Sequence, residues 1–158
     1  MEEIIVRPFR SHDAAEVSVM IRETLHVSNR KDYSQKYIES CAAQFTEEGI
    51  LRRASWTHFY VACLEGSIIG CGAIGPYWGS VTESSLFTIF VLPQYQGRGA
   101  GRRIVETLEQ DDYFLRAGRI EVPAALTARG FYEKLGYVCK PGVPQPDGEL
   151  LYRMEKFR

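Results

Sequence analysis

The pattern of hydrophobic and polar positions near the start of the chain predicts one strand and two helices. A short β-rich run at residues 4–7 is broken by Pro8. Residues 11–13 then offer caps for a helix. Its apolar positions recur at helical spacing, namely Val17, Met20, Ile21 and Leu25. A second, more polar helix is expected over residues 34–45, with boundaries good to a few residues.

The middle of the chain reads as strands. Two β-rich runs, residues 59–64 and 67–74, flank the turn dipeptide Glu65-Gly66 and predict a hairpin. Residues 86–91 are almost all apolar or β-branched, which predicts a strand covered on both faces in the middle of a sheet. Pro93 ends this strand, because proline cannot donate to a ladder.

The last third alternates helices and strands. A helix is expected to turn Ile104, Val105, Leu108 and Leu115 inward. A strand at residues 120–122 is closed by Pro123, and a helix at residues 126–135 has Gly136 at its C-cap. Strands at residues 137–139 and 150–154 are joined by a proline- and glycine-rich turn at residues 141–148. This order predicts a mixed α/β fold (α+β) with one central sheet.

Length and charge limit the function classes. The chain has 158 residues, enough for one sizeable core, and residues 1–158 are expected to form one domain. With 19 Lys and Arg against 20 Asp and Glu, the formal net charge of −1 gives no global field for binding nucleic acid or an anionic membrane. We find no signal peptide and no stretch that could span a bilayer, so a cytoplasmic protein is expected.

Metal binding is not indicated. The four cysteines show no CxxC spacing, and the three histidines lie far from them and from one another. Zinc sites need clustered ligands, so no metal is expected.

The most informative segment is a glycine-rich turn between the apolar strand and the following helix. Its residues are Gln96, Gly97, Arg98, Gly99, Ala100 and Gly101. Glycines let the backbone turn sharply and approach a ligand, and free N–H groups at a helix start suit a phosphate. An ordinary strand-to-helix turn with solvated arginines is the alternative.

Two common phosphate motifs fit the turn less well. No lysine follows these glycines, so the P-loop pattern fails. The spacing departs from the dinucleotide fingerprint, although Glu121 lies about twenty residues further on, where the ribose-binding acid of that fold sits. A dinucleotide-binding protein therefore stays as a weaker alternative.

The turn resembles a known family signature. Residues 96–101 match the Q/R-x-x-G-x-G/A signature of the GNAT superfamily of acyl-CoA-dependent N-acetyltransferases. Residues 128–137, with the sequence ARGFYEKLGY, look like the family's A-x-x-F-Y-E-K-L-G-F/Y segment. The opening residues 6–9 with Asp13 also look like the family's first strand and turn. The resemblance implies a single N-acetyltransferase domain with a mixed, mostly antiparallel central sheet and flanking helices.

The resemblance also implies acetyl-CoA as cosubstrate and the residues that bind it. The pyrophosphate would lie on the loop formed by Gln96, Gly97, Arg98, Gly99, Ala100, Gly101 and Arg102. The pantetheine arm would pair with the strand edge at Phe90 and Val91. A chain of amides can add to exposed main-chain groups in this way. Such an edge requires the neighbouring strand to diverge, and Pro93 and Pro123 would stop ladder bonding at that level.

Catalysis needs an acid and a base. Tyr132 matches the family's general acid, which would protonate the leaving thiolate. The alternative is that Tyr132 is an aromatic residue buried in the core. An acceptor amine with a pKa of about 10.4 must lose a proton before it attacks. Glu83 is the candidate base, with a solvated loop carboxylate as the slightly favoured alternative, and His58 is a second candidate.

Two positions depart from the family pattern. Ala125 stands where the family often has an asparagine, which removes one side-chain contact to the pantetheine. Gly130 lies inside a predicted helix, and close packing against the cofactor would explain it.

The acceptor stays open as the amine of a small molecule or a peptide. Its pocket is expected from residues 25–56 and 76–78 and the final turn. The aromatic residues available there are Tyr33, Tyr37, Trp56, Tyr77 and Trp78. No acidic cluster marks a polyamine pocket. A homodimer and a non-catalytic acyl-CoA-binding module also stay open.

Overall fold

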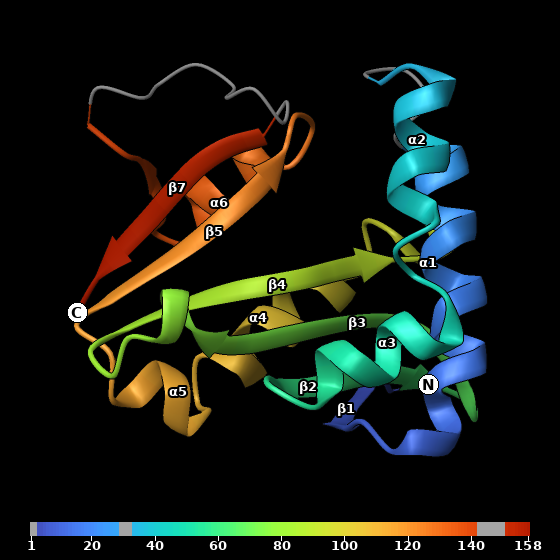
Figure 1. Ribbon diagram of the computed structural model, residues 1–158, viewed down its shortest axis with the longest axis horizontal. Helices are drawn as coiled ribbons and strands as arrows, with labels where there is room; N and C mark the ends of the chain where they lie inside the picture. Colours follow the sequence, from blue (N-terminus) through green and yellow to red (C-terminus); the bar gives the residue numbers. More distant parts are fainter. Residues whose placement is uncertain (1–2, 29–32, 142–150) are drawn as a thin grey trace.

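The strands build one mixed sheet. The computed structural model describes residues 3–28, 33–141 and 151–158. Within these residues, seven strands form a sheet in the order β1-β2-β3-β4-β5-β7-β6 (Figure 1). They are β1 (Ile5–Pro8), β2 (His58–Leu64), β3 (Ser67–Pro76), β4 (Glu83–Val91), β5 (Arg119–Ala125), β6 (Val138–Cys139) and β7 (Leu151–Phe157). Neighbouring strands are antiparallel except β4 and β5, which confirms the predicted mixed, mostly antiparallel sheet.

Helices flank this sheet. They are α1 (Ala14–Ser28), α2 (Gln35–Ala42), α3 (Glu47–Ala54), α4 (Ala100–Leu108), α5 (Asp112–Leu115) and α6 (Arg129–Lys134). In Figure 1, α4 lies behind β3 and β4, whereas α3 lies in front of the sheet. Fully buried side chains of α1, α4 and the central strands meet in one core, among them Ile21, Ile104 and Leu86. In the described part of the chain, no helix has both the length and the apolar character needed to cross a membrane.

Two helices were not expected from the sequence. The first is α3, which Thr46 caps by accepting a hydrogen bond from the Gly49 N–H at 3.1 Å. The second is α5, capped by Asp111 through the Tyr113 N–H at 2.9 Å. This second cap starts a new helix after α4 ends, so the predicted inward position of Leu115 is wrong. Its side chain lies in α5 and is 50% exposed.

The predicted hairpin is confirmed. β2 and β3 pair antiparallel across Glu65 and Gly66, whose φ angles are 50° and 83°. Two successive positive φ values are typical of the two-residue turns that match the twist of paired strands.

Of the three prolines that were expected to end strands, Pro93 follows the end of β4 as predicted, whereas the other two lie inside strands. Pro8 is part of β1 and pairs with Tyr60, which is tolerated because β1 is an edge strand. Pro123 is part of β5 and pairs with Arg153 of β7. At this level β5 pairs on one side only, so a missing N–H is acceptable on the other side. Leu150 and most of the predicted turn, residues 142–148, lie outside the described residues.

The feature that positions the site is the separation of β4 from β5. The two strands pair in parallel only from Glu83 and Arg119 to Ser85 and Glu121. Beyond this level β5 stays beside β7 and β4 stays beside β3, so the strands open like a V toward α1 and α2 (Figure 1). A β-bulge shifts the β3–β4 register near Thr88, whose φ is 56°. The expected divergence next to Phe90 and Val91 is therefore present.

Candidate active site

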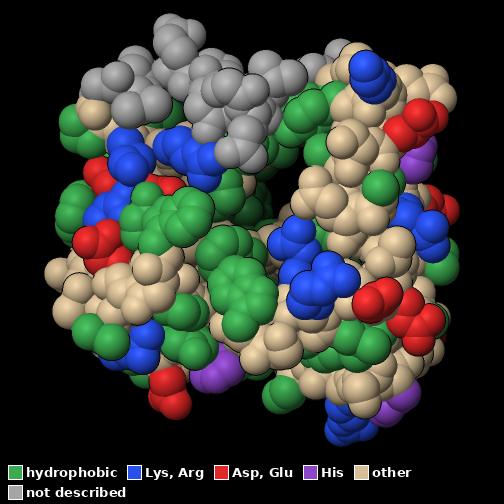
Figure 2. Space-filling model, in the orientation of Figure 1, with side chains coloured by type: hydrophobic (Ala, Val, Ile, Leu, Met, Phe, Trp, Pro, Cys, Tyr) green, Lys and Arg blue, Asp and Glu red, His purple; other side chains and the backbone are tan. Residues whose placement is uncertain are grey.

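Two cavities meet at the open end of the V. The helix-end cavity, of about 500 Å³, lies among the end of β4, the start of α4 and α6. The aromatic cavity, of about 330 Å³, lies among α2, α3, β4 and β5. Ile89, Ala128 and Tyr132 line both cavities. Figure 2 shows the surface hollowed between the side of the molecule that contains β5 and β7 and the side that contains α1 and α2. Hydrophobic and basic side chains lie at the edge of this hollow.

At the start of α4, beside the helix-end cavity, the first backbone amides have no acceptor among the described residues. Gly99 is the N-cap residue and has a φ of 83°. The Arg103 N–H donates to the Gly99 carbonyl oxygen at 3.0 Å, so the amides of Ala100, Gly101 and Arg102 come before the first bond of the helix. Apart from its two chain neighbours, a Cβ at Gly99 would meet no atom of the described residues within 4 Å. The cavity therefore has the free N–H groups and the open space that an anion needs at a helix N-terminus.

Close packing shapes the wall of this cavity. A Cβ at Gly101 would lie 3.1 Å from Phe131 Cζ, so glycine lets α6 approach α4. The Gln96 side chain donates to the Val91 carbonyl oxygen and to Ser28 Oγ, both at 3.0 Å. These bonds tie the loop to the ends of β4 and α1.

The structure brings most of the predicted cofactor residues together. The helix-end cavity is lined by Val91, Gln96, Gly97, Gly99, Ala100, Gly101 and Arg102. Phe90 lines the aromatic cavity instead. Arg98 is not part of either lining, and its guanidinium lies 5.5 Å from the ring centroid of Tyr95.

Tyr132 lies where the two cavities meet. Its side chain is 5% exposed and packs edge-on against Phe131 and Tyr137. Burial raises the pKa of Tyr132 above its ordinary value of 10, so the phenol stays protonated at neutral pH. With the residues that the structure describes, its hydroxyl makes no hydrogen bond. The side chain is thus a buried aromatic residue with a protonated hydroxyl, and it lines both cavities.

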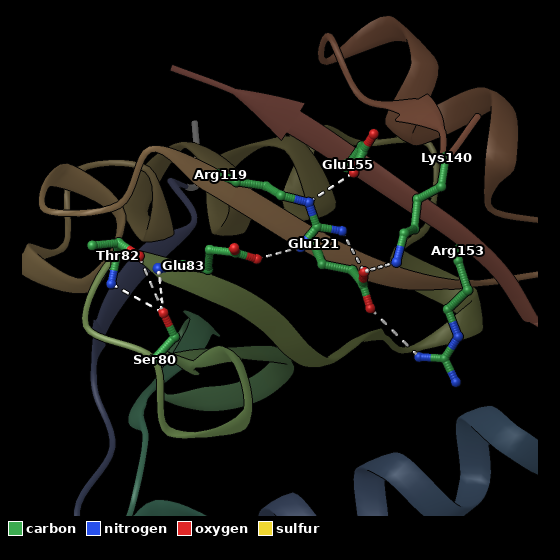
Figure 3. A network of polar contacts seen from close by, with 8 residues as sticks. All are labelled: Ser80, Thr82, Glu83, Arg119, Glu121, Lys140, Arg153 and Glu155. Carbon is green, nitrogen blue, oxygen red and sulfur yellow. Dashed lines mark hydrogen bonds and ion pairs between the residues drawn. The ribbon is translucent and has the colours of Figure 1, made fainter.

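Glu83 lies at the closed end of the V, away from both cavities. Its Oε1 accepts a hydrogen bond of 2.8 Å from Arg119, which also bonds Glu121 at 2.6 Å and Glu155 at 2.7 Å (Figure 3). Burial works against the charge of Arg119, but these three carboxylates outweigh it and raise the pKa of the guanidinium. The structure therefore does not bring Glu83 next to Tyr132, and its role as a base stays a prediction.

Glu121 belongs to the same network. Besides Arg119, it pairs with Lys140 at 3.0 Å, and its side chain is 4% exposed (Figure 3). It does not line the helix-end cavity that contains the glycine turn. The mostly antiparallel sheet and the engagement of Glu121 by Arg119 and Lys140 therefore disfavour the dinucleotide-binding alternative.

His58, the second candidate base, faces a separate cavity of about 500 Å³. Its Nδ1 lies 2.8 Å and 2.9 Å from the two carboxylate oxygens of Asp111. The Tyr60 hydroxyl donates to the same carboxylate at 2.5 Å. Among the described lining residues, this cavity shares none with the two that contain Tyr132.

The aromatic residues expected to form an acceptor pocket divide between two places. Tyr33 and Tyr37 stack at 4.7 Å between ring centroids and line the aromatic cavity. Trp56, Tyr77 and Trp78 line another cavity, of about 400 Å³, on the far side of Phe87 and Pro123.

The structure shows where the two residues that depart from the family pattern lie. Ala125 lines the aromatic cavity. Gly130 is exposed, and a Cβ there would meet nothing within 4 Å among the residues that the structure describes, so packing against these residues does not require glycine. In residues 3–28, 33–141 and 151–158, no group of three or more potential metal ligands is found.

Sequence reasoning missed Arg53, a charged side chain of the aromatic cavity. It lies in the last turn of α3, with Nη1 3.4 Å from Thr88 Oγ1 and Nη2 3.3 Å from Gln44 Oε1. Its guanidinium carbon lies 4.6 Å from the centroid of the Phe45 ring. The helix signal was present in the cap at Thr46, with acidic residues in the first turn and basic ones in the last.

Comparisons with known proteins agree with this geometry. Residues 55–139 match the family model of the acetyltransferase (GNAT) domain. An uncharacterized N-acetyltransferase of Chlorobaculum tepidum is 33% identical over 79 residues, which are 50% of this chain and about half (48%) of the length of that curated relative.

Solved structures share the fold. The PaiA N-acetyltransferase from Thermoplasma acidophilum in complex with coenzyme A superposes with a TM-score of 0.83 at 19% identity, covering 99% of both chains. A GCN5-related N-acetyltransferase from Rhodopseudomonas palustris has a TM-score of 0.80 at 24% identity, covering 100% of this chain and 98% of the other.

Proposed function

Because the chain belongs to the GNAT acetyltransferase family, we propose that it transfers an acetyl group from acetyl-CoA to the amine of a small molecule or peptide. The observation that carries this proposal is the meeting of two cavities at Tyr132 across the split between β4 and β5. One cavity suits an anionic cosubstrate and the other a small acceptor, so the two substrates would approach the same point from opposite sides.

The residues around the helix-end cavity fit coenzyme A. The open space at Gly99 and the free amides of Ala100, Gly101 and Arg102 suit a pyrophosphate. The edge of β4 at Phe90 and Val91 has no β5 partner and suits an arm of amides, which would share the Val91 carbonyl oxygen with the Gln96 side chain. When bound, acetyl-CoA supplies the thioester whose C–S bond breaks as the C–N bond to the acceptor forms.

Tyr132 is the proposed general acid. The phenol is protonated at neutral pH, as a tyrosine with the ordinary pKa of about 10 is, and this proton can pass to the departing sulfur. The acceptor must lose a proton to a base or to water. Glu83 stays the proposed base, acting through water, because its side chain lines neither cavity.

The test is thiol release from acetyl-CoA with a panel of amines, read beside thermal unfolding with coenzyme A or NADH. We expect release with at least one amine and a higher Tm with coenzyme A only, because a ligand that binds the native state stabilises it. A higher Tm without release from any amine would favour the non-catalytic acyl-CoA-binding module. Stabilisation by NADH but not by coenzyme A would overturn both.

A further inference from the structure

Arg53 stands apart from the other partly buried arginines of the described residues. Those arginines are Arg7, Arg53, Arg119, Arg129 and Arg153. All except Arg53 have a carboxylate oxygen within 4.0 Å. The hydrogen bonds of Arg53 go to two neutral oxygens at 3.3 Å and 3.4 Å, near the long limit for such contacts.

Among the described residues no carboxylate pairs with Arg53, whose guanidinium carbon lies 4.6 Å from the centroid of the Phe45 ring. Burial lowers the pKa of Arg53, and the neighbouring charge of Arg52 lowers it further. A partly desolvated guanidinium is costly unless an anion pairs with it. No acidic residue is found among the described residues that line the aromatic cavity, so the missing anion does not come from them.

The surroundings of Arg53 suit a ligand. The aromatic cavity, at about 330 Å³, is within the size range of small-molecule sites and is walled mainly by apolar and aromatic side chains. Arg53 bonds Thr88 at the bulge of β4, and the next residue, Ile89, lines both cavities. Tyr132 lines the same cavity, so an acceptor that fills it can contact Arg53 at one end and approach the point of transfer at the other.

We propose that the acceptor is an amine that also carries a carboxylate, as a free amino acid with an apolar side chain does, and that Arg53 pairs with this carboxylate. The inference rests on the proposed acetyl transfer and names its substrate class. The planar guanidinium matches a carboxylate with two parallel hydrogen bonds, whereas the aromatic walls accept the side chain. A polyamine is disfavoured, because a second cation would face Arg53.

The test compares acceptors that differ only in the carboxylate. L-phenylalanine is paired with 2-phenylethylamine, and L-leucine with 3-methylbutylamine; L-phenylalaninamide and spermidine complete the set. We expect kcat/KM to be about tenfold to a hundredfold higher for each carboxylate-bearing member, the usual effect of a charge-assisted pair. Equal or lower values for both amino acids would overturn the inference.

Variants assign the preference to Arg53. Arg53→Met should raise KM for L-phenylalanine by about tenfold to a hundredfold and leave 2-phenylethylamine nearly unchanged. Arg53→Lys keeps the charge without the planar fork and should retain part of the preference. Arg52→Met is the matched control, because Arg52 is 69% exposed and pairs with Glu48 on the helix surface. An equal loss for both acceptors in Arg53→Met would mean that Arg53 only supports the fold.

The preference for a carboxylate can be tested separately from acetyl transfer itself. Transfer to 2-phenylethylamine or spermidine in preference to the amino acids leaves acetyl transfer intact and overturns the carboxylate. As a direct binding probe, 3-phenylpropionate should raise the Tm of the coenzyme A complex more than 3-phenylpropanol does, and Arg53→Met should remove the difference. No such difference would also overturn the inference, whether or not transfer is observed.

Discussion

At the scale of single residues, environment decides what a side chain contributes. Tyr132 and Tyr137 are both buried tyrosines whose pKa is raised, chiefly by burial. Tyr137 donates its hydroxyl to Glu109 at 2.9 Å and lines neither of the two cavities at the split. Tyr132 lines both, and for this reason we propose its hydroxyl, and not that of Tyr137, as the general acid.

Replacing Tyr132 by Phe should therefore lower kcat by about a hundredfold or more, the range for loss of a general acid, with little change in the Kd of coenzyme A. Because its pKa lies above 10 in the folded chain, the wild-type rate should not fall through loss of this proton below pH 10. Steady-state kinetics across pH and calorimetry measure both. Tyr137→Phe is the control and should retain kcat; an unchanged kcat in Tyr132→Phe would remove the acid role.

A second residue-scale effect is the ion pair between β1 and the start of α1. The Asp13 carboxylate accepts two bonds from Arg7, at 2.9 Å and 3.0 Å, and one from the Arg10 N–H at 2.8 Å. The hydrogen bonds to Arg7 are the main reason that the pKa of Asp13 lies below its ordinary 3.8. Folding thus favours the ionised form, and this stabilisation is complete above pH 3.8 and is lost as the pH falls through the lower folded value.

Asp13→Asn should accordingly lower the free energy of unfolding by about 1–3 kcal/mol at pH 7, the usual range for hydrogen bonds to a charged group. The difference from wild type should shrink as the pH falls below 3.8. Urea denaturation at several pH values measures it, with Glu23→Gln on the exposed side of α1 as control. A difference that is constant from pH 7 to pH 3 would contradict the ion-pair explanation.

Among the elements, the start of α4 allows the backbone requirement for glycine to be tested separately from the requirement of ligand binding, by comparison with the β2–β3 turn. Gly99 and Gly66 both have a φ of 83°, and a Cβ at either would meet no atom within 4 Å in the part of the chain that the structure describes, apart from the adjacent residues. Gly66 lies in the hairpin turn between β2 and β3, whereas Gly99 faces the helix-end cavity. A side chain would therefore be strained equally at both positions, but only at Gly99 would it enter the helix-end cavity.

Asparagine tolerates this left-handed conformation better than other residues. Gly99→Asn and Gly66→Asn should therefore lower stability by similar amounts, about 1 kcal/mol. Only Gly99→Asn should weaken coenzyme A binding, by about tenfold or more, because its side chain occupies the space left for phosphate. Thermal unfolding and calorimetry measure the two effects. Normal coenzyme A affinity in Gly99→Asn would place the pyrophosphate elsewhere.

At the scale of the whole molecule, the split sheet depends on how its closed end is held. Arg119 joins Glu83 of β4 to Glu121 of β5 and Glu155 of β7 (Figure 3). The two acids on β5 and β7 are nearly buried, at 4% and 6% side-chain exposure. This cluster closes the V at the end where β4 and β5 still pair, and leaves the other end free to form the two cavities.

Arg119→Met should lower the free energy of unfolding by about 3–5 kcal/mol, because removing one partner leaves buried carboxylates without compensation. Urea denaturation measures this, with exposed Arg116→Met as control. Arg119→Lys, which keeps one charge, should recover part of the loss. Wild-type stability in Arg119→Met would show that the cluster does not hold the strands together.

Most helices and strands, and the glycine turn, were predictable from the chain alone. Periodic apolar positions, the Glu65-Gly66 turn and the glycine turn at residues 96–101 act over a few residues, so their patterns are readable in the chain. Other features depend on contacts between segments that are far apart in the chain. Whether Pro123 ends a strand depends on which side of β5 still has a neighbour, and whether Glu83 is near Tyr132 depends on where β4 and β5 separate. Arg53 reads as an ordinary surface charge until α3 packs beside the bulge of β4, because burial and the lack of a partner are properties of the assembled fold.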